Sequence, residues 1–124
     1  MIENSTEQYK VSQKILEMFK DRFDILINID KEEHFIGTLF PDIVFVDKKT
    51  KAPLFIIEIK KNGRISICMN AWKSAPVIPA TLYIIVPESE LQNAKSIAAV
   101  TGVKSRFGYY TLDKNGDVLK VVFE

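Results

Sequence analysis

Cysteine and histidine are nearly absent from this chain. Among its 124 residues there is one cysteine, Cys68, and one histidine, His34. A single cysteine excludes an intrachain disulfide, and the two residues are too few for a zinc site of the Cys/His type within one chain. This composition fits a reducing, intracellular setting, so we expect a cytoplasmic protein in which Cys68 is a small buried hydrophobe.

Four further features of other protein classes are missing. The opening residues, MIENSTEQYK, lack the basic-then-apolar pattern of a secretory signal, and no apolar run approaches the ~18 to 20 residues that span a bilayer. The formal net charge is only +1, which argues against a basic tail or arm that grips nucleic acid but permits a local basic patch. The five glycines form no phosphate-binding loop, so no nucleotide cofactor is expected.

The overall composition of the chain is that of an ordinary globular domain. Hydrophobic residues make up 47% of the chain and charged residues 27%, which argues against wholesale disorder. The length suits one domain over residues 1–124 that can bury a core without disulfides.

The first half of the sequence predicts one helix and three strands. Ser5 and Gln8 resemble an N-cap with its box partner, and the helical spacing of Val11 and Ile15 extends a helix over 5–22. Three strands are expected to follow, at 24–29, 42–46 and 54–59. The last two are apolar on both faces, which is typical of buried central strands.

The second half alternates helices and strands. The segment 65–75 fits a helix or a strand, and we favour a helix because its apolar residues fall on one helical face. A strand is expected at 81–86, a helix within 88–102 that ends before Gly102, and a hairpin within 109–123. The order α-β-β-β-α-β-α-β-β predicts an α/β (α+β) fold with a mixed sheet.

Three charged residues interrupt the two apolar strands. Glu58 and Lys60 are two positions apart, so strand alternation places them on one face, roughly 6.6 Å apart along the strand. If the two strands form an antiparallel hairpin, Asp42 at the start of the first lies beside them. A buried charge is costly unless it is paired or binds a metal, so this corner is either a site or the solvated end of a hairpin with an ion pair.

Two carboxylates and an ammonium group suit the hydrolysis of a phosphodiester. Asp42 and Glu58, with the backbone carbonyl of Ile59, offer the oxygen ligands that Mg²⁺ or Mn²⁺ prefers. Such a metal lowers the pKa of a bound water and stabilises charge on a phosphate. Lys60 could then hold that water or neutralise the developing negative charge.

The Pro41-Asp42 dipeptide followed by Glu58-Ile59-Lys60 resembles the motif of the PD-(D/E)xK nuclease superfamily. The similarity covers roughly residues 5 to 86 and is nearest to nuclease domains of restriction enzymes, and more loosely to Holliday junction resolvases. It implies a restriction endonuclease-like core, α-β-β-β-α-β, to which this chain adds a C-terminal helix and a β-hairpin. It also implies that Asp42, Glu58 and Lys60 are catalytic, with the metal held by Asp42, Glu58 and Ile59.

Several other residues are candidates for parts of such a site. Some members of the superfamily add an acid from the first helix, for which Glu7 is the candidate here, although a solvated helix acid is the alternative. The polar and basic residues of the candidate DNA-binding surface are Lys61, Arg64, Asn70 and Lys73. Ordinary surface charge is the alternative for these cations. His34, in a polar loop, resembles the extra histidine of some viral cap-cleaving relatives.

Two functions remain open from the sequence. The first is a Mg²⁺-dependent endonuclease acting on DNA, of a restriction, repair or recombination type. The second is a non-catalytic nuclease-like module that binds DNA or a partner protein. The segment 65–75 lacks the Gln that many restriction-type members carry there, which favours the second. A symmetric homodimer would suit a domain too small to encircle a duplex.

Overall fold

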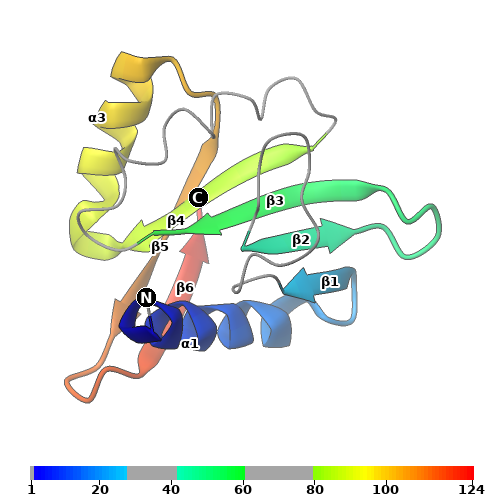
Figure 1. The fold of residues 1–124 in the computed structure, drawn as a ribbon, viewed down its shortest axis with the longest axis horizontal. Coiled ribbons are helices and arrows are strands. Elements are labelled where there is room, and N and C mark those ends of the chain that lie inside the picture. Colours follow the sequence, from blue (N-terminus) through cyan, green and yellow to red (C-terminus); the bar gives the residue numbers. More distant parts are fainter. Residues whose placement is uncertain (1, 28–41, 61–79) are drawn as a thin grey trace.

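The computed structural model describes residues 2–27, 42–60 and 80–124 of the chain (Figure 1). Two α-helices and six β-strands lie in these ranges. In chain order they are α1 (Ile2–Phe19), β1 (Asp24–Ile27), β2 (Ile43–Val46), β3 (Pro53–Ile59), β4 (Thr81–Pro87), α3 (Leu91–Thr101), β5 (Arg106–Leu112) and β6 (Val118–Phe123). The fold therefore belongs to the mixed α and β class, as the sequence predicts.

All six strands form one sheet, in the order β1-β2-β3-β4-β5-β6. The first three are antiparallel neighbours, β3 and β4 are parallel, β4 and β5 are parallel, and β5 and β6 are antiparallel. The parallel pairs need crossover connections, and α3 supplies the one between β4 and β5. The strand β3 thus lies within the sheet, and its last residues, Glu58 and Ile59, pair with β4 beyond the point where the pairing with β2 ends.

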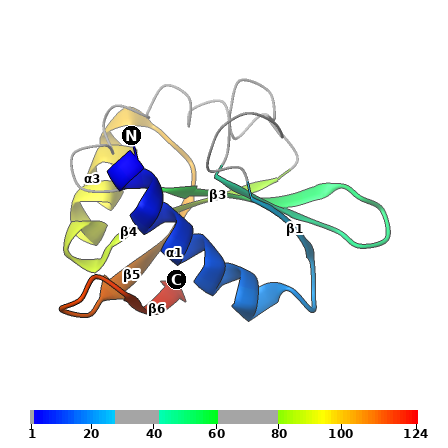
Figure 2. The same cartoon turned by 60° about the horizontal axis from the view of Figure 1, so that its bottom comes forward.

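The two helices cover opposite faces of the sheet (Figure 2). On one face, Val11 and Ile15 of α1 are fully buried. They pack in a cluster with Ile43, Phe45, Ile57, Ile59, Ile85, Tyr110 and Val121. On the other face, α3 buries its apolar side against a second cluster of Ile56, Leu82, Ile84, Val86, Leu91, Ala94, Ala98 and Val103. The central strands are therefore apolar on both faces, which explains their unbroken hydrophobic runs.

Local chemistry fixes the end of α3 and the final turn. Gly102 caps α3 in the left-handed conformation with φ 81°, where any side chain would be strained. In the β5–β6 turn, one carboxylate oxygen of Asp113 accepts bonds from the backbone N–H of Asn115 at 2.8 Å and of Asp117 at 3.0 Å. Such an Asx-type turn sets the register of the hairpin.

The structure shifts some predicted boundaries. The first helix begins at Ile2, three residues before the predicted N-cap Ser5, and ends at Phe19 rather than at 22. Fraying and short capping signals make helix ends the least readable part of a sequence. The predicted helix at 65–75 lies outside the described residues. No helix in the described ranges is both long and apolar enough to cross a bilayer.

Candidate active site

The register of β2 against β3 brings the three charged residues together. Ile43 pairs with Ile57 in an antiparallel ladder, so the residue before Ile43 faces the residue after Ile57. The backbone N–H of Asp42 donates to the carbonyl of Ile57 at 3.1 Å. Asp42 therefore lies opposite Glu58, although 16 positions separate them, as the hairpin geometry predicts.

Both carboxylates are buried and held by backbone donors. Asp42 is 0% exposed and Glu58 is 4% exposed. The N–H of Ile59 donates to Oδ2 of Asp42 at 2.6 Å, and the N–H of Asp42 donates to Oε1 of Glu58 at 3.3 Å. Hydrogen bonds to a charged acceptor are stronger than neutral ones. These backbone donors therefore offset part of the free-energy cost of removing the carboxylates from water.

The ammonium group of Lys60 lies between the two carboxylates. Its Nζ is 3.9 Å from Oδ2 of Asp42 and 4.0 Å from Oε1 of Glu58, and only 12% of the side chain is exposed. The backbone N–H of Lys60 continues the pairing with β4 by donating to Ile85 at 2.9 Å. The ammonium group thus lies within ion-pair distance of both buried carboxylates.

Ile59 pairs in register with Ile85 of β4, but its own N–H and carbonyl bond to side chains. Its N–H donates to Asp42, and its carbonyl accepts a bond of 2.8 Å from the side-chain amide of Gln8 on α1. Buried backbone groups need partners, and here the partners are Asp42, which precedes β2, and Gln8 of α1. The bond from Gln8 also ties the first helix to the end of β3.

Glu7 is bonded to a residue of β5. Its carboxylate accepts a hydrogen bond from the hydroxyl of Tyr110 on β5. Tyr110 is 1% exposed, and burial, together with the bond to Glu7, raises the pKa of its phenol above the usual range. Glu7 therefore stabilises the contact between α1 and β5, and its role as a metal ligand stays a prediction.

Two carboxylates at this corner, those of Asp42 and Glu58, could take part in holding a divalent cation that keeps part of its water shell. Within the described ranges, no group of three or more His, Cys, Asp or Glu residues could hold a metal. Mg²⁺ is usually bound by one or two carboxylates plus waters and substrate oxygens, and Asp42 and Glu58 supply two. The carbonyl of Ile59, predicted as a third ligand, already accepts the bond from Gln8.

The remaining predicted site residues fall outside the described ranges. These are His34, Lys61, Arg64, Asn70 and Lys73, and their roles stay predictions. The residue that sequence reasoning missed is Gln8, which was interpreted as part of a cap. The helical spacing could have indicated that Gln8 faces the sheet, because it lies one turn before the fully buried Val11 on the same side of the helix.

Comparisons with known proteins find no counterpart for this arrangement. No family model, no curated protein and no solved structure matches the chain significantly. A function for this chain must therefore be argued from the geometry of Asp42, Glu58 and Lys60.

Proposed function

We propose that this chain is a metal-dependent nuclease of the PD-(D/E)xK type that hydrolyses phosphodiester bonds in DNA. The observation that carries the proposal is the convergence of two buried carboxylates and one ammonium group within 4.0 Å at the end of β3. A buried charge is costly unless it is paired or binds a metal, so the burial of these carboxylates supports a role for them.

The order of elements supports the same proposal. The helix α1, the antiparallel neighbours β1, β2 and β3, and the strand β4 parallel to β3 agree with a restriction endonuclease-like core. The helix of that core between β3 and β4 corresponds to the predicted helix at 65–75. Helix α3 and the β5–β6 hairpin would be additions to the core.

Each residue has a definite chemical role in this proposal. Asp42, directly before β2, and Glu58 of β3 would hold Mg²⁺ or Mn²⁺ through their carboxylate oxygens. When bound, the metal supplies Lewis acidity toward the phosphate and a more acidic water. Lys60 orients the attacking water or neutralises charge on the phosphate, because its ammonium lies about equally far from both carboxylates.

A cleavage assay tests the proposal. Wild type is incubated with single-stranded, duplex and branched DNA in Mg²⁺, Mn²⁺ or EDTA. We expect metal-dependent cleavage that falls by about 10²-fold or more in Lys60→Ala, as for loss of one stabilising group. Lys95→Ala is the matched control, because Lys95 pairs with Glu124 on the surface, far along the chain from the site. If every DNA is uncut by wild type and Lys60→Ala alike, the proposal fails.

One observation favours a second function, a nuclease-like module that binds DNA or a partner protein without cutting. The bond from Gln8 to the Ile59 carbonyl places an amide where the superfamily resemblance implies a metal ligand. Calorimetric titration with Mn²⁺ separates the two functions. Binding that is lost in Asp42→Asn and kept in Lys60→Ala supports the nuclease, whereas no binding to wild type supports the module. We propose DNA as the partner of the nuclease, and DNA or a partner protein as that of the module. In either case we propose a symmetric homodimer as the assembly, which sedimentation velocity can test.

A further inference from the structure

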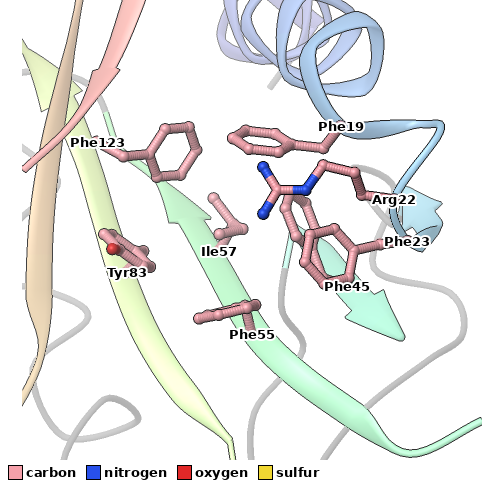
Figure 3. Close-up of a pocket in the computed structure, with 8 residues that line it drawn as sticks. All are labelled: Phe19, Arg22, Phe23, Phe45, Phe55, Ile57, Tyr83 and Phe123. Atoms are coloured by element: carbon pink, nitrogen blue, oxygen red, sulfur yellow. The ribbon is translucent and has the colours of Figure 1, made fainter. Parts of the chain in front are cut away.

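Five aromatic side chains surround a hollow on the α1 face of the sheet, and each contacts the next (Figure 3). They are Phe19, Phe23, Phe55, Tyr83 and Phe123. Neighbouring ring centroids are 6.4 Å apart for Phe19 and Phe23, 5.9 Å for Phe23 and Phe55, and 6.1 Å for Phe55 and Tyr83. Tyr83 and Phe123 are 5.1 Å apart, and Phe123 and Phe19 are 5.4 Å apart. All five are half-buried. We call this hollow the aromatic pocket.

The aromatic pocket is large enough for one ring. Its volume is about 210 Å³, and Ile57 and Phe45, both buried, complete its lining together with Arg22. A dry cavity of about 150 Å³ lined by similar side chains holds benzene, so this space accepts a six-membered ring with a short chain. The rings come from α1, the following turn, β3, β4 and β6, so folding itself forms the pocket.

Positive charge borders the pocket. The guanidinium carbon of Arg22 lies 5.8 Å from the Phe19 centroid and 5.6 Å from that of Phe23, and its nitrogens reach over the hollow (Figure 3). Arg106 pairs in register with Tyr83 and lies 5.8 Å over its ring. Within the part of the chain that the structure describes, no acidic side chain lines the pocket or forms an ion pair with either arginine.

This combination selects the charge of the occupant. A cation would be repelled by Arg22 and would compete with it for the faces of the rings. A nucleobase would leave its polar edges without partners among phenylalanine side chains. A carboxylate joined to an apolar ring satisfies both parts, since the ring fills the hollow and the guanidinium fork binds the two oxygens.

We infer that the aromatic pocket is a binding site for a small aryl-alkyl monocarboxylate, independent of the charged site at the end of β3. The ring lies among Phe55, Tyr83 and Phe123 above Ile57, and the carboxylate lies against Arg22. The ligand is a free small molecule, because one ring and a short chain fill the volume of about 210 Å³.

Titration of the full chain with 3-phenylpropanoate, followed by ¹⁵N and aromatic ¹³C NMR shifts, tests the inference. We expect saturable binding with a Kd of about a millimolar or tighter, as suits a ligand of this size. The shifts should fall on the rings of the pocket. The neutral amide, 3-phenylpropanamide, should bind at least about tenfold more weakly because the charge-assisted bonds are lost.

Two variants and two further probes decide the result. Arg22→Gln, at an exposed position, should reduce carboxylate affinity to that of the amide, whereas the neighbouring exposed Lys20→Gln should leave it unchanged. Equal binding of the amide, or unchanged binding in Arg22→Gln, overturns the inference. So does equal or tighter binding of 3-phenylpropyl-trimethylammonium. A peptide with a C-terminal phenylalanine that binds more than about tenfold tighter than the free acid overturns the small-molecule assignment.

Discussion

Replacing Lys60 with methionine removes the ammonium group between Asp42 and Glu58 while keeping most of the apolar stem of the side chain. We expect this variant to be less stable than wild type in EDTA, and we expect Mn²⁺ to restore much of the loss. The reason is that two carboxylates, 0% and 4% exposed, would share one corner without their common cation.

The size of the expected stability loss follows from the distances between the Lys60 ammonium and the two carboxylates. At an effective dielectric constant of about 20, a unit charge pair 3.9 or 4.0 Å apart is worth about 4 kcal/mol. The two attractions give a gross value of about 8 kcal/mol, much of which is offset by the desolvation of the ammonium. Loss of one partner from a buried ion pair costs about 3–5 kcal/mol. Because Lys60 retains 12% exposure, we expect a loss of about 2–4 kcal/mol.

Urea unfolding, followed by circular dichroism, measures this loss with EDTA and with Mn²⁺. Lys95→Met is the matched control, because Lys95 forms an exposed pair with Glu124 at 2.8 Å. Such surface pairs are worth about 0–1 kcal/mol, and their loss should not depend on metal.

Two results would refute the reasoning. A loss in EDTA no larger than that of Lys95→Met would mean that the carboxylates at the end of β3 do not need the ammonium. A stabilisation by Mn²⁺ that is no greater in Lys60→Met than in wild type would mean that a divalent ion does not replace its charge there.

Three further predictions concern the framework around the site. Tyr110→Phe should cost about 1–2 kcal/mol, because it removes the hydroxyl that bonds to Glu7. The raised pKa of Tyr110 means that the folded state favours the protonated phenol. The stability that this phenol contributes is therefore complete below about pH 10 and is lost as the pH rises further. Between about pH 8 and 11, the free energy of urea unfolding should decline less in Tyr110→Phe than in wild type, and parallel curves would contradict this. Gly108→Ala should lower the thermal midpoint by several degrees, because a Cβ would clash with a backbone carbonyl of β6; an unchanged midpoint would contradict the close approach. Gln8→Ala should cost about 1 kcal/mol in urea unfolding and expose the Ile59 amide region to faster hydrogen exchange, whereas Gln13→Ala, at an exposed position, should do neither.

Alternation and hairpin register account for what the sequence could predict. The apolar runs identified β2, β3 and β4 because strands buried on both faces carry unbroken hydrophobic side chains. The spacing of Glu58 and Lys60 placed them on one face, and antiparallel pairing brought Asp42 to them. These contacts depend on period and direction alone, which a single sequence contains.

Contacts between distant elements could not be predicted in the same way. The choice between Glu7 and Gln8 as the residue that meets the end of β3 depends on the rotation of α1 about its axis. That rotation is set by packing of Val11 and Ile15 on the sheet. The aromatic pocket was missed for the same reason, because its rings come from five separate segments, and no local pattern joins them.

The first helix and the last hairpin are bound to each other, and this has a consequence for synthesis on the ribosome. The bond between Glu7 and Tyr110 joins residues 103 positions apart, and the pair of Lys10 and Asp117 joins residues 107 apart. At about 5–20 residues per second, α1 waits roughly 5–20 s before these partners are made. Val11 and Ile15 lack their contacts with Tyr110 of β5 and Val121 of β6 during that time, so we expect slower translation to increase aggregation of the nascent chain.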